Sequence, residues 1–166
     1  MQAAPSFAGA VEAHLDDVYA YLLYLTGDRE AAEDLAADTF EKALRLWRRY
    51  DPRRASVRTW LCQIARTTAL DHFRAEERRR RREGRYAVSA GERDEQVFGE
   101  GLSPALEAAL ARLSAAEREV VALRIVLELD GEAAARVLGI SATACSTRLS
   151  RALQKLEKEV SAGAAA

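Results

Sequence analysis

The side chains best suited to contact a nucleic acid lie between residues 56 and 82. Aromatic rings alternate with cations there, and the segment ends in five consecutive arginines at 78–82. Rings stack on unpaired bases while cations follow the phosphate backbone, so this pattern indicates single-stranded DNA binding. A solvated face or a disordered tail would equally explain the arginine run alone. Asp71 could accept a hydrogen bond from a base amino group, but we favour a salt bridge with Arg74 or Arg66.

A second, different signature lies near the C-terminus. Residues 131–158 predict two helices joined by the turn Gly139-Ile140-Ser141, which is the pattern of a helix-turn-helix. One face of the second helix is apolar and consists of Cys145, Leu149, Ala152, Leu153, Leu156 and Val160. The opposite face is polar and consists of Thr143, Thr147, Arg151, Gln154 and Lys155, with Arg148 at its edge. The apolar face can dock on the preceding helix while the polar face enters the major groove, although an ordinary helical hairpin is the alternative.

Residues capable of catalysis or metal binding are not grouped in this sequence. Cys62 and Cys145 have no CxxC partner, and His14 and His72 lack the spacing of metal ligands. We interpret the cysteines as buried structural thiols rather than as a redox switch or a metal site. Because there is also no nucleophile–base pair and no phosphate-binding glycine loop, we expect no enzymatic activity, no cofactor and no metal.

Charge is distributed unevenly along the chain, although the net charge is only −1. Residues 1–44 carry two basic and nine acidic side chains. Residues 45–82 carry thirteen basic and four acidic side chains, and residues 83–166 carry ten basic and thirteen acidic ones. A basic centre between acidic flanks is a plausible nucleic-acid footprint. The acidic flanks also repel phosphate, so we expect the free protein to bind DNA weakly.

Helical periodicity predicts the elements that position the basic segment. A first amphipathic helix is expected to end at Gly27, and a second, capped by Asp28, to run to about Tyr50. Helical spacing places Phe40, Ala43, Leu44 and Trp47 on one face of the second helix. A third helix should begin after Ser56 and continue to about Arg82, which places the basic segment on one long helix.

Four further helices are predicted in the C-terminal part, with N-caps at Ser103, Ser114, Asp130 and Ser141. Together these elements predict an all-α fold with two small helical lobes. The first is an N-terminal helical bundle over residues 7–83, and the second is a helix-turn-helix bundle over residues 103–160. Glycines and acids between them predict a flexible linker at residues 84–102.

Neither a membrane span nor a signal peptide is predicted. No apolar run reaches the roughly 18 residues that a spanning helix needs, and the first residues lack a basic start followed by an apolar stretch. We therefore expect a cytoplasmic protein without membrane insertion.

Four segments, in this order, resemble bacterial RNA polymerase sigma factors of the extracytoplasmic-function group, the short two-lobe class. Residues 25–35, LTGDREAAEDL, resemble the "LTGDxxxAEDL" turn of that group, and residues 34–47 resemble its helix for core-polymerase binding. Residues 60–74 resemble its promoter-melting helix, and residues 110–120 together with the helix-turn-helix resemble its second DNA-binding lobe. The resemblance covers nearly everything except the linker and the ends.

The resemblance implies three functional surfaces. Core RNA polymerase would be bound by the helix carrying Asp34, Leu35, Ala37, Asp38, Phe40, Leu44 and Trp47. The minus-ten promoter element would be captured as a single strand, with one base held out of the stack, by the loop 51–55 and the helix that follows it. The residues expected to make these contacts are Asp51, Arg53, Arg58, Trp60, Arg66, Thr67, Asp71, Arg74 and Arg78. The minus-thirty-five element would be read as duplex DNA by Thr143, Ser146, Thr147, Arg148 and Arg151. An anti-sigma factor that covers the polymerase-binding faces is a further partner implied by the group.

Several positions depart from the pattern of that group. Ala37 stands where Gln is common, so the polymerase contact is expected to be weaker or rearranged. Thr67 stands where Asn is common, so the minus-ten preference is expected to be unusual. Ser146 and Ser150 replace a common Lys and a common His, which removes two expected phosphate contacts and predicts weak or non-standard minus-thirty-five binding.

The linker and the C-terminal tail carry two further hypotheses. Acids in the linker, Glu92, Asp94, Glu95 and Glu100, would mimic nucleic acid inside the polymerase. The tail ends in Ala165-Ala166, which resembles tails recognised by a bacterial unfoldase and its protease, although a frayed, inert tail is the simpler interpretation.

Two competing functions stay open from the sequence. A conventional helix-turn-helix regulator would bind duplex DNA as a dimer and without polymerase. A sigma-like protein that has lost DNA contacts would instead sequester a partner, and the serine at 146 is its best support.

Overall fold

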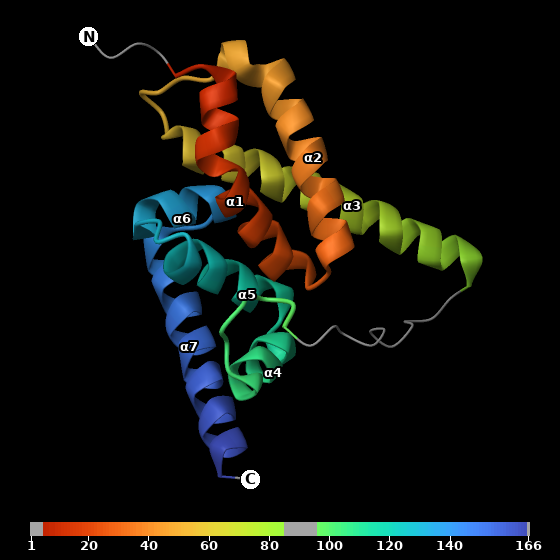
Figure 1. The fold of residues 1–166 in the computed structure, drawn as a ribbon, viewed down its shortest axis with the longest axis vertical. Helices are drawn as coiled ribbons and strands as arrows, with labels where there is room; N and C mark the ends of the chain where they lie inside the picture. Colours follow the sequence, from red (N-terminus) through yellow and green to blue (C-terminus); the bar gives the residue numbers. More distant parts are fainter. Residues whose placement is uncertain (1–4, 85–95, 166) are drawn as a thin grey trace.

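The computed structural model describes residues 5–84 and 96–165, which are helical and contain no strand (Figure 1). The N-terminal lobe comprises α1 (Phe7–Thr26), α2 (Arg29–Leu46), the 3₁₀ turn η1 (Trp47–Arg49) and α3 (Val57–Glu83). The C-terminal lobe comprises α4 (Pro104–Arg112), α5 (Ala115–Val121), the π-helical turn η2 (Ala122–Val126), α6 (Gly131–Leu138) and α7 (Ala142–Ala164). The predicted all-α fold is confirmed, and none of the described helices is long and apolar enough to cross a membrane.

Helix ends follow the local capping chemistry that the sequence predicted. The predicted N-caps Asp28, Ser56, Ser103, Ser114, Asp130 and Ser141 all accept a hydrogen bond from a backbone N–H in the first turn of their helix. Gly27 and Gly139 adopt the left-handed conformation that ends α1 and α6. The second helix is shorter than predicted, because α2 ends at Leu46 and the chain tightens into η1 before the turn at Tyr50.

The N-terminal lobe is built from α1, α2 and α3, which pack on one another around Leu22, Leu35 and Leu61. In the C-terminal lobe, α7 packs on α4, α5 and α6. Ile140, in the turn between α6 and α7, packs against the core, so the turn carries the apolar plug that a helix-turn-helix requires.

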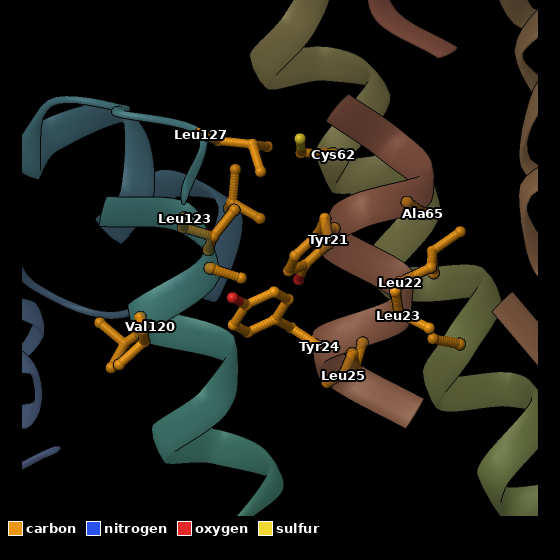
Figure 2. Close-up of a cluster of buried hydrophobic side chains, with 14 of the residues drawn as sticks. Tyr21, Leu22, Leu23, Tyr24, Leu25, Cys62, Ala65, Val120, Leu123 and Leu127 are labelled. Carbon is orange, nitrogen blue, oxygen red and sulfur yellow. The ribbon is translucent and has the colours of Figure 1, made fainter. Parts of the chain in front are cut away.

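The two lobes share one continuous core instead of lying apart. We call their contact the lobe interface: α1 packs on α5 and η2, and α3 packs on α6. Figure 2 shows Tyr21 and Tyr24 of α1 pointing toward Val120, Leu123 and Leu127 across this interface. All five side chains are buried.

The C-terminal end of the predicted linker also belongs to this core. Val97 and Phe98 are buried, and the Phe98 ring lies 5.2 Å from that of Tyr24. The backbone N–H of Phe98 donates to Glu107 Oε1 at 2.9 Å, while Arg29 donates to the carbonyl of Gln96 at 2.7 Å. Residues 96–98 are therefore fixed against both lobes, unlike the expected flexible linker; residues 85–95 lie outside the described part of the chain.

The core makes a direct prediction about stability. Leu61 is fully buried, whereas Leu44 is 57% exposed. Leu61→Ala should lower the free energy of unfolding by about 3 kcal/mol, because a buried cavity is left behind, whereas Leu44→Ala should change it by less than about 0.5 kcal/mol. Urea denaturation followed by circular dichroism measures both; equal losses would contradict this assignment of the core.

Candidate nucleic-acid and polymerase interfaces

A cluster of four aromatic rings supports the predicted minus-ten loop at residues 51–55. Trp47 stacks on Tyr50 with ring centroids 5.5 Å apart, and Trp60 lies 5.8 Å from Trp47 and 5.2 Å from Tyr50. Phe7 completes the cluster against Trp47. The Tyr50 hydroxyl donates to the carbonyl of Ala55 at 2.9 Å, which ties the two ends of the loop together. Trp60 is thus half-buried as a support of the loop, not a freely exposed stacking platform.

Within the loop, Asp51 and Arg53 form a small local ion pair. The Asp51 carboxylate accepts from the backbone N–H of Arg53 at 2.9 Å and from its guanidinium at 3.1 Å. These hydrogen bonds hold the pKa of the Asp51 carboxyl below its usual range. The loop therefore presents a preformed shape with an exposed arginine at its tip.

The predicted minus-ten cations on α3 have different partners. Arg58 lies 3.5 Å from Asp17 of α1, and Arg74 lies 3.5 Å from Asp71, which confirms the salt bridge favoured from the sequence. Arg66 instead reaches across the lobe interface to Glu119, at 2.6 Å. Thr67 is exposed, as is Arg78.

The arginine run is the exposed end of α3, so the disordered-tail interpretation is wrong. Two of its members form ion pairs within the helix, Arg79 with Glu76 at 3.4 Å and Arg81 with Glu77 at 3.2 Å. Arg78, Arg80 and Arg82 make no ion pair with any other described residue. This end of α3 projects away from the other helices, where it can meet a phosphate backbone (Figure 1).

The predicted polymerase-binding helix, α2, has one face turned to solvent. Asp34, Ala37, Asp38 and Leu44 share this face and are exposed. Leu44 shares an apolar face with Ala43 in the sequence, but the structure buries Ala43 and leaves the Leu44 side chain 57% exposed. Leu35 is buried in the core, and Phe40 and Trp47 are partly buried, so these three position the exposed face from behind.

The recognition face of α7 is open to solvent as predicted. Thr143, Ser146, Thr147 and Arg151 are exposed, and Arg148 is half-buried. Most of this face lines a shallow hollow of about 630 Å³ at the N-terminal end of α7. Lys155, at the edge of the hollow, donates to Glu117 of α5 at 2.9 Å. On the opposite face Leu153 is 40% exposed, so its predicted place among the docked apolar residues is wrong.

The cysteines are buried, as interpreted from the sequence. Neither forms a disulfide, and burial raises the pKa of the Cys62 thiol to about 12. No cluster of potential metal ligands exists among residues 5–84 and 96–165.

The sequence reasoning missed the polar residues of the lobe interface. Glu119 and Arg118 are both buried, although they lie in a charged stretch of the helix that suggests a solvent-facing surface. Arg118 donates to the carbonyl of Tyr24, at 2.8 Å, and its guanidinium lies over the Phe98 ring. The sequence signal for their burial was their position directly before the apolar run at 120–123, because a helix that carries such a run has little surface left to face the solvent.

Comparison with known proteins matches each lobe to a family model. The model for Sigma-70 region 2 matches residues 10–79, and the model for Sigma-70, region 4 matches residues 103–156. The ECF RNA polymerase sigma factor BldN of Streptomyces coelicolor is 32% identical, and the match covers 93% of this chain and 60% of BldN. The RNA polymerase sigma factor YlaC of Bacillus subtilis is 30% identical, with 89% of this chain and 87% of that protein covered.

A solved structure matches both lobes together. It is the sigma factor RpoE of Bartonella quintana in complex with the anti-sigma factor NepR, with a TM-score of 0.80 and 25% identity. The match covers 93% of this chain and 96% of that one, so the arrangement of the two lobes is shared as well as their folds. From the two family models and these relatives, the chain belongs to the ECF RNA polymerase sigma factors.

Proposed function

We propose that this chain binds core RNA polymerase and directs it to promoters, reading the minus-ten element as a single strand and the minus-thirty-five element through its helix-turn-helix. The observation that carries this proposal is the presence of two different nucleic-acid-binding helices, α3 and α7, in the order of sigma regions 2 and 4. No catalytic step is assigned to the chain itself, because polymerase performs the chemistry.

The minus-ten element would be held by the loop 51–55 and the first half of α3. Holding a base outside the duplex costs a few kcal/mol, so the protein must offer a preformed pocket in compensation. The tied loop ends and the aromatic cluster supply such preformed structure. Thr67 and the exposed arginines of α3 would then follow the displaced strand.

The minus-thirty-five element would be read by the exposed N-terminal face of α7. Hydroxyl groups and guanidinium groups near a helix N-terminus suit phosphate and base contacts in the major groove. Ser146 is exposed at the edge of this face, so a short hydroxyl stands where a long cation would reach a phosphate. This supports the expectation of weak or non-standard minus-thirty-five binding.

Polymerase would be bound by the outer face of α2. The exposed leucine on this face can serve as an apolar anchor, and the carboxylates Asp34 and Asp38 can form part of a polar rim around it. Ala37 lies on the same face and leaves it flatter than a Gln would.

Two further partners belong to the proposal. An anti-sigma factor is supported by the RpoE–NepR complex, whose sigma factor has the same arrangement of lobes. Proteolytic turnover through the tail rests on Ala165, the last described residue, which is exposed; Ala166 lies outside the described part. Of the linker acids proposed as nucleic-acid mimics, Glu100 is exposed, and Glu92, Asp94 and Glu95 lie outside the described part.

Run-off transcription with purified chain, core RNA polymerase and a fragment carrying the upstream region of its own gene tests the proposal. A defined transcript that requires both proteins is expected. Absence of both a transcript and core binding would instead favour the conventional regulator. Core binding without a transcript from any promoter fragment would favour the sequestering protein.

The α2 face predicts a specific loss of polymerase affinity. Leu44→Asp should weaken core binding about tenfold or more, because truncating or charging an interface anchor typically costs 1–2 kcal/mol. Leu15→Asp is the matched control, since Leu15 is a similarly exposed leucine on α1. Fluorescence titration of core polymerase measures both; equal affinities for the two variants would contradict the assignment.

The α7 face predicts a loss that depends on the minus-thirty-five sequence. Arg151→Ala should reduce transcription roughly tenfold at the intact promoter, since a good base contact is worth about 1–3 kcal/mol. The loss should vanish on a template whose minus-thirty-five element is scrambled. Lys158→Ala, an exposed cation further along α7, is the control and should leave both templates unaffected.

A further inference from the structure

The lobe interface contains one buried carboxylate that joins three helices. Glu119 of α5 is 4% exposed, and its Oε1 accepts hydrogen bonds from the Tyr21 hydroxyl of α1 at 2.5 Å and from Arg66 Nε of α3 at 2.6 Å. Tyr21 is fully buried. Both donors come from the N-terminal lobe, and the acceptor comes from the C-terminal lobe.

This carboxylate depends on its partners while the lobes are together. A buried charge without an opposite charge or hydrogen bonds is strongly unfavourable, so Glu119 needs both donors in the closed arrangement. Once the lobes separate, water can solvate the carboxylate and the guanidinium independently. The contact therefore stabilises closure without penalising the separated state.

Arg66 is also one of the residues expected to hold the minus-ten strand. Among the described contacts of the predicted minus-ten cations, Arg58 pairs with Asp17 and Arg74 with Asp71 inside their own lobe, whereas Arg66 pairs across the interface. In the closed arrangement its Nε is bound to Glu119 and its side chain is only 26% exposed, so little of the guanidinium is left open to a phosphate. Arg136 of α6 donates in addition to the carbonyl of Arg54, so the C-terminal lobe also holds the minus-ten loop.

The closed arrangement is too short to reach both promoter elements. Elements centred near minus ten and minus thirty-five lie about 25 base pairs apart, which is roughly 85 Å of duplex at about 3.4 Å per base pair. A compact chain of this length has a radius of gyration of about 15 Å. Promoter binding by both lobes therefore requires them to separate, and separation breaks the contact between Glu119 and Arg66.

We propose that Glu119 is an intramolecular competitor of DNA that holds the free factor closed by occupying Arg66. The proposal rests on the sigma-factor function proposed above. Closure of this kind is built into the chain itself, and binding of polymerase and promoter must supply the free energy to open it. An anti-sigma factor would then capture an arrangement that already exists.

Glu119→Gln tests the proposal, because it keeps the size and one acceptor oxygen for Tyr21 but removes the charge that holds Arg66. Cys62 provides the readout: it is buried on α3 and faces Leu127 across the interface, whereas Cys145 is buried within the C-terminal lobe (Figure 2). Iodoacetamide labelling followed by peptide mass spectrometry measures both thiols in one sample.

The variant should label Cys62 about tenfold to a hundredfold faster than the parent chain, since hydrogen bonds to charged groups are worth about 1.5–3 kcal/mol, while the rate at Cys145 stays the same. Glu159→Gln is the matched control: it removes a carboxylate that pairs with Arg112 inside one lobe and should change neither rate. An unchanged rate at Cys62, or equal acceleration of both thiols, would overturn the proposal.

Two measurements keep the test decisive if Glu119→Gln folds poorly. Glu119→Asp retains the charge but shortens the reach, and should accelerate Cys62 by a smaller factor. Small-angle scattering of the unaltered chain should match the closed arrangement of the lobes, and a profile of separated lobes would overturn the proposal without any variant.

Core-binding and transcription assays distinguish a failure of the sigma-factor function from a failure of the inhibitory role proposed for Glu119. In the opened variant, core polymerase should be bound more tightly, because less of the free factor is closed. Faster labelling of Cys62 with unchanged or weaker core affinity would overturn the inhibitory role of Glu119. Absence of any transcript from the parent chain would refute the sigma-factor function, while the labelling rates still decide whether Glu119 closes the lobes.

Discussion

The buried carboxylate of Glu119 is the contact on which the arrangement of the two lobes depends. Apolar side chains such as Tyr24, Leu123 and Leu127 supply most of the buried area of the lobe interface, and this attraction is not directional. The hydrogen bonds from Tyr21 and Arg66 are directional, so they select one orientation of the lobes. Arg118, which donates to the carbonyls of Tyr24 and Leu113, adds a second polar contact at the same place.

This arrangement divides the proposed polymerase-binding and DNA-binding surfaces into two groups. The outer face of α2, the recognition face of α7 and the arginine-rich end of α3 remain exposed in the closed molecule. The minus-ten loop and Arg66 are engaged by the other lobe. The outer face of α2 is thus open to a first contact with polymerase, whereas engagement of both lobes at once and capture of the single-stranded minus-ten element require opening.

The linker also contributes to the contact between the lobes. Phe98 packs on Tyr24 and under Arg118, and Glu107 fixes its backbone, so the chain that joins the lobes is itself part of their contact. A linker of 19 residues spans at most about 65 Å when fully extended. Opening therefore has to release Phe98 as well as Arg66, which couples the path of the linker to the state of the lobes.

The sequence by itself determined the helices, their caps, the helix-turn-helix and the family resemblance. These features are local: an N-cap serine acts within three residues, and a helical face repeats every three or four. The same reasoning located the polar face of α7 but misplaced Leu153, and it put Ala43 and Leu44 on one apolar face although only Ala43 is buried, because periodicity does not say how wide a packed face is.

Only the tertiary structure decided that the lobes close on each other and that Arg66 pairs with Glu119. The residues involved are 53 and 98 positions apart in the chain, and a glutamate or an arginine in a charged helix has no local mark of burial. Their burial depends on which helices of the two lobes meet, and that is set by contacts between residues far apart in the chain.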